Sequence, residues 1–278
     1  MLPLIEAEEL KTAHHDLVII DARGGKDSHE RYLSGHLDKA IYVDLDRNLA
    51  AHTDNPAIGG RHPLPSVKEF TEFLGNLGIT PESHVVIYDD KSGAMSAARL
   101  WWMLRSIGHE KVQVLNGGLQ AAVEAGIPVT TEAYTPKPAS PYPYNGEWTG
   151  TVDIEETGKA VKDEKRMVID VRENARYLGK TEPLDLIAGH IPGAENLPYT
   201  ENLTAQGKYR SPEELKTHYQ NKLGSIKPED VIVHCGSGVT ACHTLLGMEQ
   251  AGIKGSKLYV GSWSEWSRRD LPIATENK

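Results

Sequence analysis

Residues 231–248 read VIVHCGSGVTACHTLLGM. The first residues are mostly apolar and β-branched, which is typical of a buried strand, and Cys235 follows them directly. A glycine-containing turn and a helix-like run come next. In such a unit small residues let successive backbone N–H groups face one point, and the helix directs the positive end of its dipole there. The sequence therefore predicts an anion site at Cys235.

The atom placed at this point is the sulfur of Cys235. We expect the thiol to lose its proton readily and to act as a nucleophilic thiolate. The alternative is that Cys235 is only a small hydrophobic residue at the end of a core strand. The glycines after the cysteine favour the reactive site, whose backbone donors would be Gly236, Ser237, Gly238, Val239 and Thr240.

The composition is that of a soluble globular protein. The chain has 278 residues, of which 39% are hydrophobic and 25% are charged, enough for two domains. Acidic residues outnumber basic ones by 39 to 30, and no block of Lys or Arg stands out. We therefore expect no nucleic-acid partner and no anionic membrane partner.

Cysteine usage and the start of the chain bear on location. The two cysteines, Cys235 and Cys242, are too few for a disulfide framework and suit a reducing compartment. The first residues lack the features of a signal peptide, and no apolar run approaches the roughly 18 residues of a membrane span. A cytoplasmic protein is the expectation.

The two halves of the chain carry the same motifs in the same order. Each half has a short strand ending in Asp-x-Arg, a Gly-His pair, a helix opened by Ser-x-x-Glu, and further strands alternating with helices. The corresponding residues are Asp21 and Asp170, Arg23 and Arg172, His36 and His190, Ser66 and Ser211, and Glu69 and Glu214. This pattern indicates a tandem duplication of an α/β domain, each copy a mostly parallel sheet with helices on both faces.

The expected organisation has three parts. An N-terminal domain covers residues 1–132, a proline-rich linker covers 133–149, and a C-terminal domain covers 150–278. Prolines at 136, 138, 141 and 143 predict a stiff, extended linker.

The duplication supplies a control within one sequence, because features present in both halves are expected to be architectural. We therefore interpret Asp21 with Arg23, and Asp170 with Arg172, as structural ion pairs or turns, and the paired histidines as hydrogen-bonded structural groups. Asp89 stands where Cys235 stands in the other half. The N-terminal half therefore lacks the nucleophile and is expected to be catalytically silent.

Other residues occur in one half only. Aligning Ser66 with Ser211 places Gly207 opposite His62, and Asp46 also lacks an acidic counterpart. Together with Ser237 they could form a relay that moves a substrate proton. The alternative is a surface histidine and a solvated carboxylate.

Arg176 lies in the first loop of the C-terminal half and could bind a substrate anion through two N–H groups. Arg31 matches it in the other half, so a structural role and a binding role both stay open. Trp263 and Trp266 are expected to be packing aromatics.

Three motifs together carry a resemblance to a known family. They are GHIPGA at 189–194, CGSGVT at 235–240 and GSWSEW at 261–266. With both Asp-x-Arg strands, they make the chain similar to the two-domain rhodanese-type sulfurtransferases over essentially its full length. The resemblance implies two tandem rhodanese-like domains, with the catalytic cysteine in the C-terminal one.

The resemblance also implies roles for individual residues. The loop after Cys235 is similar to the 3-mercaptopyruvate sulfurtransferase version, and Asp46, His62 and Ser237 match that family's triad-like set. Arg176 matches one of two arginines that hold the mercaptopyruvate carboxylate. The second position falls on Asp185, which leaves thiosulfate or another persulfide donor open.

The function that the resemblance implies is transfer of a sulfane sulfur through a persulfide on Cys235. The donor would be 3-mercaptopyruvate or thiosulfate, and the acceptor would be a thiol, such as thioredoxin or a small thiol, or cyanide. No metal or organic cofactor is expected. A non-enzymatic persulfide carrier in a sulfur relay is the alternative. A cysteine phosphatase is disfavoured because the sixth residue after Cys235, where that chemistry needs an arginine, is Ala241.

Overall fold

The computed structural model describes residues 1–13 and 17–276. Contacts divide the chain into two compact units. The first unit comprises Met1–Ala51, Pro65–Thr149 and Ala205–Lys208, and the second comprises His52–Leu64, Gly150–Thr204 and the chain from Tyr209 onward. The segment that contains His62 therefore belongs with the Cys235 loop in the second unit.

The first unit is built on a five-stranded parallel sheet with strand order β1-β6-β5-β2-β4. A short antiparallel pair, β3 with β7, accompanies it. Its elements are β1 Leu4–Ile5, α1 Ala7–Ala13, β2 Leu17–Asp21, α2 Ser28–Ser34, β3 His36–Leu37, β4 Ile41–Tyr42, α3 Leu45–Asn48, α4 Val67–Asn76, β5 His84–Tyr88, α5 Ser96–Ser106, β6 Val112–Leu115, α6 Gly118–Glu124 and β7 Val129–Thr130.

The second unit repeats this architecture. Its five-stranded parallel sheet has strand order β10-β9-β11-β12-β8. Its elements are β8 Thr151–Val152, α7 Ile154–Ala160, β9 Met167–Asp170, α8 Asn174–Tyr177, β10 Glu195–Asn196, the 3₁₀ helix η1 Tyr199–Asn202, α9 Pro212–Leu223, the 3₁₀ helix η2 Pro228–Asp230, β11 Val231–His234, α10 Thr240–Gln250, β12 Lys257–Tyr259 and α11 Ser262–Trp266.

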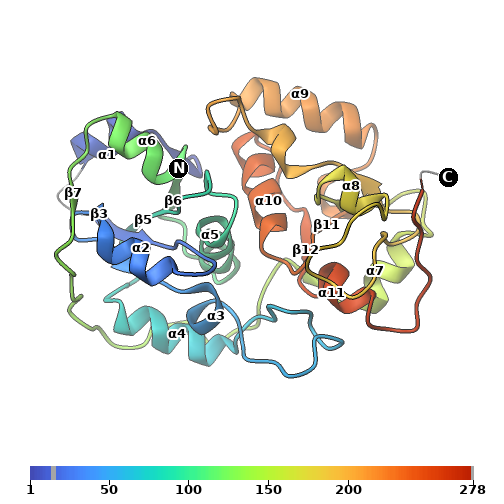
Figure 1. The fold of residues 1–278 in the computed structure, drawn as a ribbon, viewed down its shortest axis with the longest axis horizontal. Helices are drawn as coiled ribbons and strands as arrows, with labels where there is room; N and C mark the ends of the chain where they lie inside the picture. The colour runs from blue at the N-terminus through green and yellow to red at the C-terminus, as the bar shows by residue number, and fades with distance from the viewer. Residues whose placement is uncertain (14–16, 277–278) are drawn as a thin grey trace. The chain divides into compact units, whose positions relative to one another are not determined.

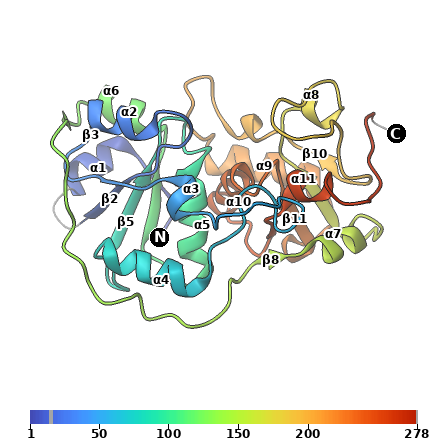
Figure 2. The same cartoon turned by 60° about the horizontal axis from the view of Figure 1, so that its bottom comes forward.

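Helices cover both faces of each sheet. Figure 2 shows α1, α2 and α6 on one side of β2 and β5, with α3, α4 and α5 on the other. In the second unit, α9 and α10 lie on one side of β11 and β12, and α7 and α11 lie on the other (Figure 1). Buried aliphatic side chains from the strands fill the space between the layers, as expected for parallel sheets covered on both faces. The predicted α/β class, with a sheet repeated in tandem, is confirmed.

Local sequence signals account for where several elements begin. Ser66 caps α4 and Ser211 caps α9, each through the reciprocal hydrogen bonds of a capping box with Glu69 and Glu214. The strands expected before Cys235 and at the two Asp-x-Arg motifs all form, since β11 ends at His234, β2 ends at Asp21 and β9 ends at Asp170.

The residues shared by the two halves have the structural roles expected of them. Asp21 and Arg23 form a buried ion pair, and Asp170 and Arg172 form its counterpart. His36 and His190 are both buried. The Nδ1 atom of each lies 2.7 Å from the carbonyl oxygen of the tyrosine it stacks on, Tyr32 or Tyr177 respectively.

The proline-rich segment runs along α4 within the first unit. The backbone N–H of Ala139 donates to the Gly75 carbonyl at 2.8 Å, and that of Tyr142 donates to the Thr71 carbonyl at 2.9 Å. A Cβ on Gly75 would come within 2.6 Å of the Ser140 carbonyl oxygen, so this close approach requires glycine.

Buried neutral histidines should make the fold sensitive to acid. Burial lowers the pKa of His243 to about 3, and its Nδ1 accepts a hydrogen bond from Asn202, which places it in the neutral form. The unfolded histidine takes up a proton near pH 6.5, so stability is lost as pH falls below that value, by up to about 1.4 kcal/mol per pH unit. We expect His243→Gln to flatten the slope of unfolding free energy between pH 7 and 5.

The control for this measurement is His52→Gln, because the His52 side chain is 87% exposed. Urea unfolding at several pH values would give both slopes. Equal slopes in wild type and His243→Gln would contradict the assignment of His243 as a buried neutral group.

Candidate active site

Cys235 lies directly after β11, at the carboxyl edge of the second sheet. Only 3% of the surface of Cys235 is exposed, and α10 begins five residues later at Thr240. β11 pairs with β9 so that His234 is opposite Asp170, and the Asp170–Arg172 turn therefore lies beside the cysteine. Neither Cys235 nor Cys242 forms a disulfide.

Two carbonyl groups fix the direction of the loop. The N–H of Trp263 donates to the Cys235 carbonyl at 3.0 Å, and the N–H of Ser264 donates to the Gly236 carbonyl at 2.8 Å. In a trans peptide the C=O and the following N–H point in opposite directions. The N–H groups of Gly236 and Ser237 therefore both point away from α11, and within the described chain neither donates to another group.

The corresponding loop of the first unit holds a buried carboxyl group, whose pKa is raised by burial although four backbone hydrogen bonds oppose that shift. Asp89 follows β5 as Cys235 follows β11. Its carboxylate accepts backbone hydrogen bonds from Lys91 and Gly93 at 2.8 Å, from Met95 at 3.2 Å and from Ala97 at 3.4 Å. A turn at this strand end can thus direct several amides toward the side chain that begins it.

His62 and Ser237 meet in the second unit. His62 Nδ1 and Ser237 Oγ lie 2.8 Å apart and share a hydrogen bond. The loop before His62 is fastened to α11: the N–H of Gly59 donates to Glu265 Oε1 at 3.0 Å, and the N–H of Arg61 donates to Ser264 Oγ at 3.0 Å. These two hydrogen bonds hold the loop so that His62 lies next to Ser237.

The backbone conformation of this loop depends on Gly60. Its φ is +80°, and a Cβ there would lie closer than van der Waals contact to the Gly261 carbonyl oxygen and to the Ser264 hydroxyl. A side chain at position 60 would therefore push the loop off α11.

Arginines surround the Cys235 loop. Arg176 Nη2 lies 3.4 Å from the position that a Cβ on Gly236 would occupy, and Arg61 Nη2 lies 3.3 Å from the same point. Glu182 holds Arg176 through a 2.7 Å hydrogen bond. Asp185, whose side chain is fully buried, accepts from Arg61 at 3.0 Å. Sequence reasoning missed Arg61, although it is the residue before the predicted His62.

A further arginine near the site, Arg172, has a fully buried side chain. Arg172 binds Asp170 through Nε and Nη2, and its guanidinium carbon lies 4.8 Å from the centre of the Trp263 ring. Burial opposes the charged form, but the negative charges of Asp170 and Glu182 raise the pKa of Arg172. The predicted packing role of Trp263 and Trp266 is confirmed, since both are buried in the second core.

The predicted site residues divide between the units. Ser237, His62, Arg176 and the loop from Gly236 to Thr240 belong with Cys235 in the second unit. Asp46 lies in α3 of the first unit, where its backbone N–H donates to Asp44 Oδ1 at 2.9 Å. Its part in a relay stays a prediction.

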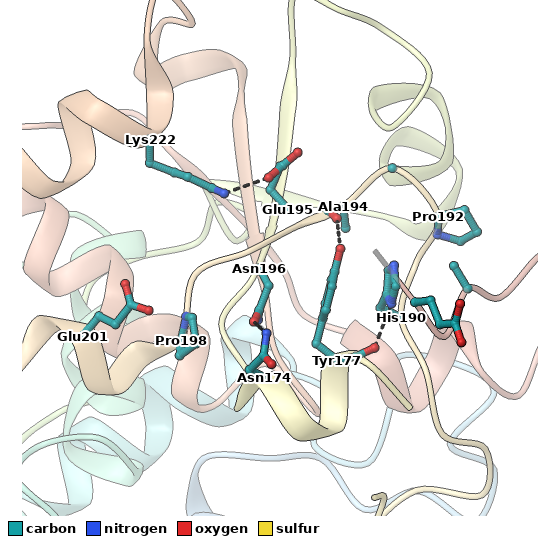
Figure 3. A pocket seen from close by; sticks show the side chains of 13 residues that line it. Asn174, Tyr177, His190, Pro192, Ala194, Glu195, Asn196, Pro198, Glu201 and Lys222 are labelled. Carbon is teal, nitrogen blue, oxygen red and sulfur yellow. Dashed lines mark hydrogen bonds and ion pairs between the residues drawn. The ribbon is translucent and has the colours of Figure 1, made fainter. Parts of the chain in front are cut away.

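The second unit also has a hollow of about 630 Å³ beside α8, which does not include the Cys235 loop. Figure 3 shows that several of its polar side chains already bond to one another. Lys222 binds Glu195 at 2.7 Å, and Asn174 binds Asn196 at 3.1 Å. The hollow therefore offers few unpaired groups to a ligand.

No cluster of three or more His, Cys, Asp or Glu side chains suited to a metal ion occurs among residues 1–13 and 17–276. No helix in these ranges is long and apolar enough to span a bilayer.

Known proteins are similar to this chain in sequence and in fold. The family described as rhodanese-like domain matches residues 6–125 and 153–269. A probable 3-mercaptopyruvate sulfurtransferase of Pseudomonas aeruginosa is 35% identical over 288 aligned positions, covering 98% of each chain. The thiosulfate sulfurtransferase of Rattus norvegicus is 37% identical over 253 positions, covering 90% of this chain and 83% of the rat protein.

A solved structure agrees with the sequence matches. The 3-mercaptopyruvate sulfurtransferase from Leishmania major superposes with a TM-score of 0.84 at 32% identity, covering 96% of this chain and 74% of that one. The two parallel sheets and the cysteine turn define a tandem rhodanese-like protein. The chain belongs to the two-domain rhodanese-type sulfurtransferase family.

Proposed function

We propose that this protein is a sulfurtransferase that takes a sulfur atom from 3-mercaptopyruvate or thiosulfate onto Cys235 and passes it to a thiol or to cyanide. The observation that carries the proposal is the surroundings of Cys235. The cysteine ends a buried strand, the amides of Gly236 and Ser237 point away from α11, and the Ser237–His62 pair adjoins them. Family membership supports the same chemistry.

The first displacement differs between the two donors. The Cys235 thiolate attacks the donor sulfur and forms an S–S bond. With 3-mercaptopyruvate the S–C bond breaks and its electron pair forms the pyruvate enolate. The proton of the donor's own thiol then moves to the carbon that carried the sulfur, which gives pyruvate. With thiosulfate the S–S bond breaks and sulfite leaves with the pair, so no proton moves. Either way the enzyme gains one sulfur as a persulfide anion.

Asp89 in the first unit supports the idea that such an anion can be held. Its carboxylate oxygens lie two bonds from Cβ, as the outer sulfur of a cysteine persulfide does. Four backbone N–H groups bind them. In the second unit the amides after Cys235 and the N-terminus of α10 would stabilise the persulfide in the same manner.

The second displacement restores the enzyme. An acceptor thiol attacks the outer sulfur, the persulfide S–S bond breaks, and its electron pair returns to Cys235 while the acceptor leaves as a persulfide. Cyanide would leave as thiocyanate by the same step. Neither half-reaction requires a metal or an organic cofactor.

Mass spectrometry of the intact protein tests the proposal. After separate exposure to 3-mercaptopyruvate and to thiosulfate, the mass should increase by one sulfur atom, and peptide mapping should place it on Cys235. Cys242→Ser should take up the sulfur as wild type does. Absence of uptake from both donors would refute the proposal, and release to only one partner protein would favour a dedicated carrier.

Ser237 and His62 should matter more for one donor than for the other. By resemblance, Asp46 would complete their relay. Because only 3-mercaptopyruvate needs a proton moved, Ser237→Ala and His62→Ala should lower its kcat about 10²- to 10⁴-fold. The rate with thiosulfate should fall less than about tenfold, since sulfite leaves without a proton. Steady-state kinetics with both donors would show this, and equal losses would contradict a proton relay.

A further inference from the structure

We propose that Arg61, held in place by Asp185, is a second cation of the donor site and binds the donor's anionic group together with Arg176. The inference extends the proposed function by naming the group that recognises the donor. Its starting point is that both guanidinium groups approach one place. Arg61 Nη2 and Arg176 Nη2 lie 3.3 Å and 3.4 Å from the position of a Cβ on Gly236, the residue next to the nucleophile.

Arg61 is held firmly enough to act as a binding group. Its Nε donates to Asp185 Oδ1 at 3.0 Å and its Nη2 to Oδ2 at 3.4 Å, while its backbone N–H binds Ser264. The Asp185 side chain is fully buried, whereas that of Arg61 is 23% exposed. The arginine therefore has a fixed stem and a guanidinium edge that a ligand can reach.

Asp185 does not cancel the charge of Arg61, because it is shared. Arg268 Nη1 donates to the same carboxylate at 2.9 Å, and Arg176 Nη2 lies 3.6 Å from it. Glu182 also binds Arg176, so two carboxylates face the three guanidinium groups of Arg61, Arg176 and Arg268, which leaves positive charge uncompensated. The acid at position 185 thus orients a cation toward the site instead of repelling an anionic donor.

Unused donors remain on both arginines. Among the described residues, Nη1 of Arg61 and Nη1 of Arg176 donate to no protein group. A planar guanidinium matches two oxygens of one anion, and an anion above Gly236 can accept from both side chains. The carboxylate of 3-mercaptopyruvate and the sulfonate of thiosulfate share this chemistry.

Alkylation of Cys235 provides a test that needs no sulfurtransferase activity. Iodoacetate carries a carboxylate and iodoacetamide does not, so the ratio of their rates at Cys235 reports the cations beside it. Any change in thiolate content affects both reagents equally and cancels in the ratio. In Arg61→Gln we expect the iodoacetate-to-iodoacetamide ratio to fall about tenfold, the loss of one charge-assisted hydrogen bond. Peptide mapping would assign the modification to Cys235 and not to the fully buried Cys242.

The matched control is Arg166→Gln. Arg166 belongs to the same unit and forms a 2.6 Å ion pair with Glu156, but it is not part of the Cys235 site. Its ratio should equal that of wild type. Arg61→Lys keeps the charge and loses the planar fork, so its ratio should lie between those of wild type and Arg61→Gln.

Kinetics then separate the two donors. In Arg61→Gln, kcat/KM should fall at least about tenfold, mainly through KM, for each donor whose anion Arg61 binds. A loss confined to one donor would identify that donor's anion as the ligand. A rate ratio in Arg61→Gln within twofold of wild type would overturn the inference, whatever the outcome of the sulfur-uptake experiment. If the ratio falls while no donor loads Cys235, the anion site stands and the proposed function fails.

Discussion

Replacing Cys235 with serine should abolish sulfur transfer from either donor, lowering kcat/KM by at least about 10⁴-fold, the scale found when a covalent nucleophile is removed. A serine hydroxyl fits the same space and keeps the backbone of the turn, but it is not ionised near neutral pH and forms no persulfide. The variant should still fold, because the residue's fixed contacts are made by its backbone, to Ser262 and Trp263.

Cys242→Ser is the matched control for this variant. Cys242 lies in α10, and its thiol donates to the Gly238 carbonyl at 3.4 Å, a bond that a hydroxyl can also make. We expect it to retain turnover. Steady-state assays with both donors, together with circular dichroism to check folding, would measure the difference. Residual turnover of more than a few per cent in Cys235→Ser would show that another group carries the sulfur.

Replacing Arg172 with methionine should destabilise the second unit strongly. The side chains of Arg172 and Asp170 are 1% and 0% exposed, so the variant leaves a buried carboxylate without its cation. Breaking a buried pair from one side costs about 3–5 kcal/mol. The loss of the contact with the Trp263 ring adds to this cost. We expect a fall in Tm of roughly 10 °C, measured by differential scanning calorimetry.

The first unit contains a matched variant, Arg23→Met. Arg23 binds Asp21 through Nε and Nη2 as Arg172 binds Asp170, and each also donates to a glycine carbonyl. Both variants should lower Tm, and hydrogen exchange should rise around β2 in one and β9 in the other. Of these two variants, only Arg172→Met should change the alkylation rate of Cys235, because Arg172, unlike Arg23, interacts electrostatically with the Cys235 side chain. A Tm within 2 °C of wild type in either variant would contradict the argument.

Much of the fold follows from the sequence because its signals are local. These signals are the short apolar runs of the strands, the two Ser-x-x-Glu caps and the glycines after Cys235. Each acts over a few residues, and the elements form where the signals occur. The internal repeat adds a second level, since it separates architectural residues such as Asp170 and Arg172 from those peculiar to one half. The sequence also shows that Asp89 occupies, in the first half, the position that Cys235 occupies in the second. It does not show the four backbone amides that bind the Asp89 carboxylate.

The sequence by itself thus determined the class of fold, and it predicted Cys235 as the nucleophile and the first unit's loop as its silent copy. Only the tertiary structure decided which side chains surround Cys235. The His62–Ser237 bond joins residues 175 positions apart, and Arg61 reaches Asp185 across 124 positions. Such pairs depend on how a loop is fastened, here by Gly59 and Arg61 on α11, and no periodicity or spacing in the chain encodes that attachment. An acid at position 185 therefore suggested a lost cation, whereas in the folded chain it holds one in place.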